Sequence, residues 1–209
     1  MKKKLTLVVT CIVLVAAMVI GGTLAYFTDT KSAENTFTVG GVKITLTEPN
    51  WEKTGKKDAE TVYAGEPLLK DPTVSVDAGS NPCFVRIKVE GLKQFGDKGD
   101  IIYRTNYVNN ALHEGWVLHT DGYFYWTKPL VEASAVNDSW NAQYKLTSAT
   151  EPLFDQIVMP TGLVGDETAS PIVVTAQAVQ AQGAKAAWAD VNTMTVAEIA
   201  AWFTTCGMK

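Results

Sequence analysis

The sequence predicts a mostly β protein, an antiparallel β-sandwich of jelly-roll type with a short C-terminal helix. Apolar and polar residues alternate over several short segments, turn residues separate these segments, and the pattern becomes helical only near the end of the chain. With 209 residues, 46% hydrophobic and 19% charged, the chain is long enough for one ordinary domain with a real core. A barrel is an alternative, because strand patterns alone do not separate the two architectures.

The first 25 residues have the pattern of a secretory signal peptide. A basic start at Lys2–Lys4 precedes an apolar stretch of 16 residues, Leu5–Ile20. Thr23 and Ala25 then occupy the minus-three and minus-one positions of a signal-peptidase site. The pattern predicts export and a mature chain that begins at Tyr26.

An uncleaved anchor helix is the alternative for this leader, since 16 apolar residues fall just short of the ~18 to 20 that span a bilayer. The small residues after the apolar stretch favour cleavage. Lipoprotein processing is disfavoured, because Cys11 lies inside the apolar run and follows Thr10. Contact with a membrane is therefore expected only through the uncleaved leader.

The charge of the mature chain argues against nucleic acid as a partner. Cleavage removes three lysines and no acidic residue, which leaves 15 basic and 22 acidic side chains and a net charge of about −7. Phosphate backbones and anionic surfaces attract proteins of the opposite charge. We expect neither as the natural ligand.

Two cysteines, Cys83 and Cys206, remain after processing. Export makes a disulfide between them possible, but two cysteines do not define a disulfide scaffold. The alternative is that both are small buried hydrophobic residues. The sequence leaves this choice open.

The mature chain begins with a strand pattern that contains a joint. Phe37 and Val39 share one parity, and after Gly40 and Gly41 the apolar residues continue on the other parity from Val42. A change of parity at a glycine pair indicates a bulge or a kink. We therefore divide the chain into a leader (1–25), an N-terminal strand with its Gly-Gly joint (26–41) and a sandwich domain (42–209).

Further strands follow along the domain. Residues 49–61 are polar and turn-rich and predict a loop, whereas residues 74–76 alternate. The run CFVRIKV (83–89) predicts an antiparallel strand with one apolar face and one solvated face that carries Arg86 and Lys88.

The clearest hairpin is WVLHTDGYFYW, residues 116–126. Asp121 and Gly122 fit a two-residue type I′ turn, which pairs Thr120 with Tyr123 and sets the register of both strands.

The last part of the chain supplies two more strands and a helix. Residues 152–159 and 171–180 read as strands, and the small and β-branched residues of the second suggest a central position. Thr195 and Glu198 fit a capping box that starts a short helix. Its apolar face includes Phe203.

Catalytic chemistry has little support in the sequence. His113–Glu114 begins like a zinc-protease motif, but Val117 stands where that motif needs its second histidine. His119 is six residues from His113, about 20 Å away along an extended strand, which is too far for one metal ion. We expect no enzyme, assign no catalytic residue, metal ligand or cofactor, and place both histidines at solvent-facing strand or loop positions.

A resemblance to a known family covers most of the chain in separate blocks. The lysine-rich leader and GGTLAYFTDTKSAENTFTVGGVKITLTE (21–48) closely resemble the start of the TasA and camelysin family of Gram-positive bacteria, whose leaders are removed by SipW-type signal peptidases. The likeness continues at residues 68–89, 121–130, 151–159 and 173–183. The leader block is the most specific of these.

The resemblance implies a secreted jelly-roll protein of the biofilm matrix or cell surface. TasA-type members form fibres in which the N-terminal strand of one subunit fills a groove in the next. It implies as partners a second copy or a related family member, and a SipW-type signal peptidase. The donor residues would be Tyr26, Phe27, Phe37 and Val39, with Gly40 and Gly41 as the hinge.

General physics supports the same assembly. A strand on a glycine joint can leave its own sheet and complete that of a neighbour. Cleavage before Tyr26 would free this strand, which explains why no linker separates the leader from it. Three alternatives stay open: a stable monomer that the strand closes upon itself, a monomeric adhesin-like binding module, and a camelysin-like metalloprotease.

Overall fold

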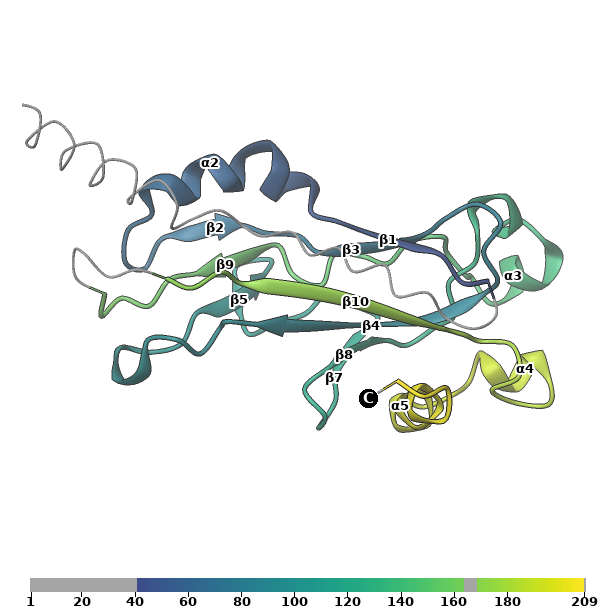
Figure 1. Cartoon of the computed structure of the whole chain (residues 1–209). Helices are drawn as coiled ribbons and strands as arrows, with labels where there is room; N and C mark the ends of the chain where they lie inside the picture. The colour runs from purple at the N-terminus through teal and green to yellow at the C-terminus, as the bar shows by residue number, and fades with distance from the viewer. Residues whose placement is uncertain (1–40, 164–168, 209) are drawn as a thin grey trace, which may run out of the picture.

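The computed structural model describes residues 41–163 and 169–208. The described part is mostly β, as predicted, with ten strands in antiparallel pairs (Figure 1). The strands are β1 (Ile44–Thr47), β2 (Pro67–Leu69), β3 (Thr73–Val76), β4 (Cys83–Glu90), β5 (Ile102–Thr105), β6 (Val108–Asn109), β7 (Trp116–Leu118), β8 (Phe124–Trp126), β9 (Gln156–Val158) and β10 (Val173–Gln180).

The described strands form three sheets. Two have four strands, in the orders β10-β4-β8-β7 and β2-β9-β5-β6, and the third is the pair β1-β3. The mostly β, antiparallel class is confirmed, whereas the connectivity of a jelly roll stays a prediction.

Helical segments are short and lie outside the sheets. In Figure 1, α2 lies above β2, and α5 lies on the opposite side of the body, below β4 and β8. In the described ranges, no helix has the length and apolar character needed to cross a membrane. The helical segments are a π-helical turn (Trp51–Gly55), α2 (Lys56–Asp58), α3 (Ser139–Gln143), α4 (Trp188–Val191), α5 (Val196–Thr205) and 3₁₀ turns at Ala59–Thr61, Gly96–Lys98 and Ala133–Ala135.

The main core lies between the two four-stranded sheets. Val85 and Ile87 of β4 face it from one sheet, and Ile157 of β9 faces it from the other. Tyr103 joins the layers, because its ring packs edge-on against Phe124 with 5.8 Å between centroids. Alternation along these strands therefore places the apolar residues as predicted.

The predicted solvated face of β4 is wrong for Phe84 and Arg86, whereas the side chain of Lys88 is 41% exposed as predicted. Phe84 is fully buried, and Arg86 is only 2% exposed. This face packs against α5 in a second apolar cluster that also contains Val179, Ile199 and Phe203. A helix from the end of the chain covers the face, and the local alternation of β4 carries no information about that cover.

The loop predicted for residues 49–61 is also wrong, because this segment is helical. The carboxylate of Asp71 accepts hydrogen bonds from the backbone N–H groups of Asn50 (2.9 Å) and Trp51 (3.2 Å). These are the amides that a helix start leaves without internal partners. Trp51 is buried, and the Nζ of Lys70 lies 4.7 Å from its ring centroid. The stabilising partners lie some 20 residues downstream of the segment.

The 116–126 hairpin forms, but its register differs from the prediction by one residue. Leu118 pairs with Phe124, and the N–H of His119 donates to the Tyr123 carbonyl (2.9 Å), so the loop has three residues instead of two. Asp121 accepts a hydrogen bond from the N–H of Tyr123 (3.0 Å), which stabilises the longer loop. Aspartate side chains commonly bond to the backbone two residues on.

Strand β10 forms within the predicted range 171–180 but is not central. All eight of its residues pair with β4, and within the described residues it has no second strand partner. Ala176 and Ala178 are buried against the main core, so their small size serves packing of the sheet face. The predicted strand 152–159 is shorter, because only Gln156–Val158 pairs as β9.

The C-terminal helix and its start are confirmed. The N–H of Glu198 donates to the Thr195 hydroxyl (3.3 Å), and the Glu198 carboxylate accepts from the N–H of Thr195 (2.9 Å). Ile199 and Phe203 are buried beneath α5. The indole N–H of Trp202 donates to the carbonyl of Gln180 (2.8 Å), which ties the helix to the end of β10.

Candidate assembly site

Most of the predicted assembly residues precede the described part of the chain. The sequence-predicted cleavage, donor and hinge residues that lie outside the described residues are Thr23, Ala25, Tyr26, Phe27, Phe37, Val39 and Gly40. Their roles stay predictions. Gly41 is the one residue of this set that the structure describes.

Gly41 is the first residue that the structure describes. Its φ is +75°, a backbone conformation that costs other residues about 1–2 kcal/mol. The position is open, because a Cβ there would come no closer than 3.8 Å to the Asn81 side chain. Glycine is therefore required for the dihedral angle and not for space. The next residue, Val42, is buried.

Polar contacts hold β1 firmly just after this joint. The Thr45 hydroxyl donates to Asp77 (2.8 Å), and the N–H of Lys43 donates to the Ser80 hydroxyl (2.9 Å). All four residues of β1 pair with β3. A change in the direction of the chain before Val42 would therefore fall at Gly41 or earlier.

Strand β10 is a long strand at the end of its sheet among the described residues. Natural edge strands are usually protected by charges, prolines or short length. Strand β10 has eight residues, with neither a charged residue nor a proline among them. Within residues 41–163 and 169–208, β4 is the strand that pairs with it.

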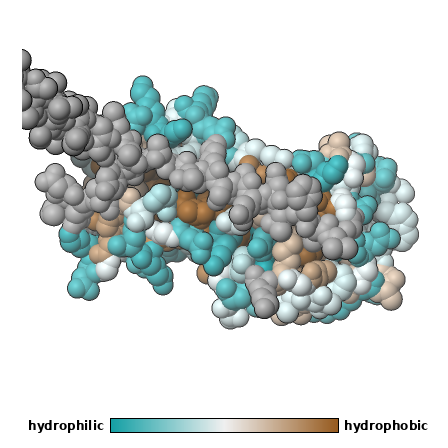
Figure 2. All heavy atoms as spheres, viewed as in Figure 1, coloured by the Kyte–Doolittle hydropathy of each residue, from teal (hydrophilic) through white to brown (hydrophobic). Residues whose placement is uncertain are grey.

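The surface around the sheets carries exposed apolar side chains. Figure 2 shows brown, hydrophobic side chains between teal ones on the face viewed in Figure 1. The most exposed large residues include Tyr107 (85%) and Val108 (58%) on the β5–β6 hairpin, and Leu118 (50%) on β7. Strands β6 and β7 end their sheets, so these side chains lie on outer strands.

Arg86 is the centre of a buried polar network beside β10. Its Nε donates to the Gln177 side chain of β10 (2.7 Å), and its Nη1 donates to the Tyr125 hydroxyl (2.9 Å). The guanidinium carbon lies 3.8 Å from the ring centroid of Tyr123. Arg86 therefore fastens β10 and the β7–β8 hairpin to β4.

The acid of this network is Asp121, which accepts a hydrogen bond from the Tyr125 hydroxyl (2.7 Å). Burial by itself would raise the pKa of Asp121, but the hydrogen bonds from Tyr125 and from the Tyr123 N–H outweigh it, so that pKa is lowered. Burial, together with the bond to Asp121, raises the pKa of Tyr125 to about 12. The tyrosine therefore stays protonated at neutral pH and acts as a donor.

The two histidines lie in loops and are largely covered, which corrects the expected solvent-facing positions. The His113 Nε2 lies 2.6 Å from Asp155, with 21% of the His113 side chain exposed. The His119 Nδ1 lies 3.2 Å from Asp121, with 26% of the His119 side chain exposed. Each histidine thus lies beside a different aspartate.

A metal ion has no matching set of ligands in the described part. Among residues 41–163 and 169–208, no three His, Cys, Asp or Glu side chains lie close enough to hold one. Cys83 is buried in the main core, Cys206 is exposed, and both are free thiols. The expectation that both cysteines are buried is therefore wrong for Cys206.

The comparison with protein families concerns the start of the chain. A family model described as camelysin metallo-endopeptidase matches residues 1–52. Over these residues the chain is similar to that family, in agreement with the resemblance of its leader block. The match includes only residues 41–52 of the described structure, from Gly41 through β1 to Trp51. Searches of curated proteins and of solved structures find no match.

Sequence reasoning missed the residues that hold the described body together. Arg86 sits in an ordinary alternating strand, and Asp71 acts on a segment some 20 residues earlier in the chain. Neither carries a local motif. The one available signal was the position of Arg86 in the middle of the run CFVRIKV.

Proposed function

We propose that this chain is an extracellular structural subunit that assembles into fibres by donating its N-terminal strand to the sheet edge of the next copy. The observation that carries this proposal is the uncharged, eight-residue edge of β10. Strand addition gains its affinity from main-chain hydrogen bonds along such an edge and its specificity from alternate side chains.

The N-terminal sequence supplies a fitting donor. Phe27, Phe37 and Val39 share one parity, so an extended strand would place them on the same face, and Gly41 has a left-handed backbone conformation. The β10 edge is the acceptor in this proposal. Cleavage before Tyr26 by a SipW-type peptidase would release the donor, so assembly would follow secretion.

Two chains test the proposal, one that begins at Tyr26 and one that begins at Gly41. Light scattering and negative-stain electron microscopy should show filaments for the first and small particles for the second. Matching circular dichroism spectra and melting curves ensure that the shorter chain is folded. If both stay monomeric at high concentration, self-assembly is abandoned in favour of a monomeric surface-binding module.

A peptide of residues 26–39 sharpens the test. The chain that begins at Gly41 should bind it saturably, and a control peptide with Phe37 and Val39 both changed to Asp should bind more weakly. If the peptide binds but the Tyr26 chain stays monomeric, the strand closes its own sheet, and the monomer alternative holds.

A second candidate function, proteolysis, is favoured by the printed description of the family model, metallo-endopeptidase. The described residues do not fit a three-ligand metal site, so no catalytic step is derived. Casein hydrolysis by the purified chain, with and without a chelator, tests this candidate. Loss of a chelator-sensitive activity in Glu114→Gln, with the fold intact, would establish the protease and displace the structural role.

A further inference from the structure

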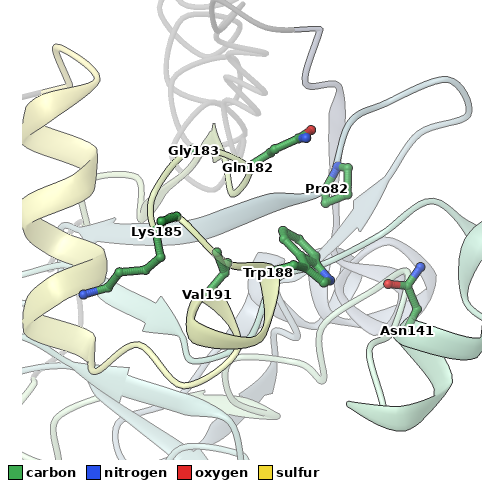
Figure 3. Close-up of a pocket in the computed structure, with 8 residues that line it drawn as sticks. Pro82, Asn141, Gln182, Gly183, Lys185, Trp188 and Val191 are labelled. Atoms are coloured by element: carbon green, nitrogen blue, oxygen red, sulfur yellow. The ribbon is translucent and has the colours of Figure 1, made fainter.

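A pocket of about 540 Å³ lies at the end of the molecule where α3 and α4 meet the start of β4 (Figure 3). Its lining comes from segments far apart in the sequence, so the pocket exists only in the folded chain. Its volume falls within the range of sites for small ligands. The lining includes Pro82, Asn141, Gln182, Lys185 and Trp188.

Trp188 provides the apolar surface of the pocket. Figure 3 shows its indole ring in the middle of the lining residues, between Gln182 and Asn141. The residue is half-buried, because part of it packs against the second apolar cluster. The Nδ2 of Asn192 donates to the Trp188 carbonyl (3.0 Å), which helps to fix the backbone of α4.

Two amide side chains supply hydrogen-bonding groups on either side of this ring. The Nδ2 of Asn141 donates to the Ala135 carbonyl (2.8 Å), which holds the side chain with its oxygen toward Trp188 (Figure 3). Gln182 is exposed at the opposite rim. An amide both donates and accepts hydrogen bonds, so it suits a hydroxyl, which does the same.

The one charged side chain in the pocket lining is already paired with an acidic residue. Lys185 is the charged residue of the lining, and its Nζ forms an ion pair with Glu198 at 2.5 Å. Figure 3 shows the Lys185 side chain directed away from Trp188. An anionic ligand would have to compete with Glu198 for this lysine, so an uncharged ligand is favoured.

We propose that this pocket binds a neutral saccharide. The C–H face of a sugar ring would lie against the Trp188 indole, and its hydroxyl groups would bond to the amides of Asn141 and Gln182. An aromatic side chain offers a large apolar face at little conformational cost, and the two amides set the orientation. The inference is independent of fibre formation, since none of these residues belongs to the β10 edge.

The test follows the indole N–H signal of Trp188 in ¹H–¹⁵N spectra of the full chain, identified by its loss in Trp188→Phe. The probes are cellotetraose and chitotetraose, with a uronic-acid tetramer as the charged comparison. We expect both neutral probes to shift the Trp188 signal saturably. No shift with either neutral probe, or tighter binding of the uronic-acid tetramer, would overturn the proposal.

Three variants locate the binding. Trp188→Ala should abolish it, and Gln182→Ala should weaken it about fivefold, the effect of one lost hydrogen bond of about 1 kcal/mol. Trp140→Ala is the matched control, because Trp140 is exposed on α3 beside Asn141 but does not line the pocket. Loss of binding in Trp140→Ala with retention in Gln182→Ala would assign the saccharide to the outer aromatic surface and overturn the proposal.

If Trp188→Ala fails to fold, Gln182→Ala still tests the site, because Gln182 is exposed and its substitution removes no core contact. A peptide of residues 26–39 serves as the last probe. If the peptide shifts the Trp188 signal and neither saccharide does, the pocket receives a chain segment and the saccharide site is wrong.

Discussion

The guanidinium of Arg86 donates a hydrogen bond to the Tyr125 hydroxyl across 2.9 Å, inside the layer between the β4 sheet and α5. That hydroxyl in turn donates to Asp121 at 2.7 Å. The ring of Phe203 on α5 lies 4.6 Å from the guanidinium carbon. A buried charge is costly unless it is paired, and here an aromatic cage and a chain of hydrogen bonds compensate it.

Tyr125→Phe should therefore destabilise the protein. The change keeps the ring in the apolar cluster and removes only the hydroxyl, so Arg86 loses one of its acceptors and Asp121 loses one of its donors. We expect the free energy of unfolding to fall by about 1–3 kcal/mol. Urea denaturation measures this, with Tyr107→Phe as the control.

Tyr107 is 85% exposed. Its substitution should change stability by less than about 0.5 kcal/mol. Equal losses of stability in Tyr125→Phe and Tyr107→Phe would show that the hydrogen bonds of the buried network do not stabilise the fold.

The start of α5 should respond to acid. Hydrogen bonds from Lys185 and from the Thr195 N–H lower the pKa of Glu198 from 4.5 to about 2. A lowered folded-state pKa means that the stabilisation is complete above about 4.5 and is lost as the pH falls toward about 2. Melting temperatures measured from pH 5 to pH 2 should fall less steeply in Glu198→Gln than in the unmodified chain. An identical slope in both would contradict the assignment.

The two cysteines of the body should differ sharply in reactivity. Burial raises the pKa of Cys83 to about 12, whereas Cys206 is exposed at the end of α5. The thiolate is the reactive form, so a maleimide should label Cys206 and spare Cys83 in the native protein, and label both in urea. Peptide mass mapping locates the label. Protection of both until a reductant is added would indicate a disulfide.

Gly115→Ala should be strongly destabilising. The residue has φ +96°, and a Cβ would lie 2.4 Å from the Trp126 ring. That ring packs edge-on against Trp116 with 5.5 Å between centroids, so it has little room to move. We expect the free energy of unfolding, measured by thermal or urea denaturation, to fall by about 2–4 kcal/mol. Overpacking and backbone strain both contribute to this loss.

Gly79→Ala is the matched control for this substitution. Gly79 has φ +74°, but nothing lies within 4 Å of a Cβ placed there. Gly79→Ala should lower the free energy of unfolding only by the cost of a left-handed backbone at alanine, about 1–2 kcal/mol. A loss in Gly79→Ala as large as that in Gly115→Ala would mean that the clash with Trp126 is relieved without cost.

Elements whose stabilising partners are local in sequence were predictable. The capping box of α5 needs only Thr195 and Glu198, three residues apart, and both of its hydrogen bonds are present. The alternation of β4 predicted its inward face correctly.

Elements whose partners are distant were not predictable. The 49–61 segment is helical because Asp71 bonds to its first amides, and the second face of β4 is buried because α5, more than 100 residues later, packs on it. The hairpin register depended on a single aspartate side chain, since a three-residue and a two-residue loop fit the same sequence.

The sequence by itself determined the mostly β class, several of the strand segments and the terminal helix, because periodicity and capping are encoded by neighbouring residues. Only the tertiary structure decided that β10 is an edge strand among the described residues, that Arg86 is buried, and that Trp188 and Asn141 share a pocket. These properties depend on which distant surfaces meet, and the free energy of that packing is not a sum of local preferences.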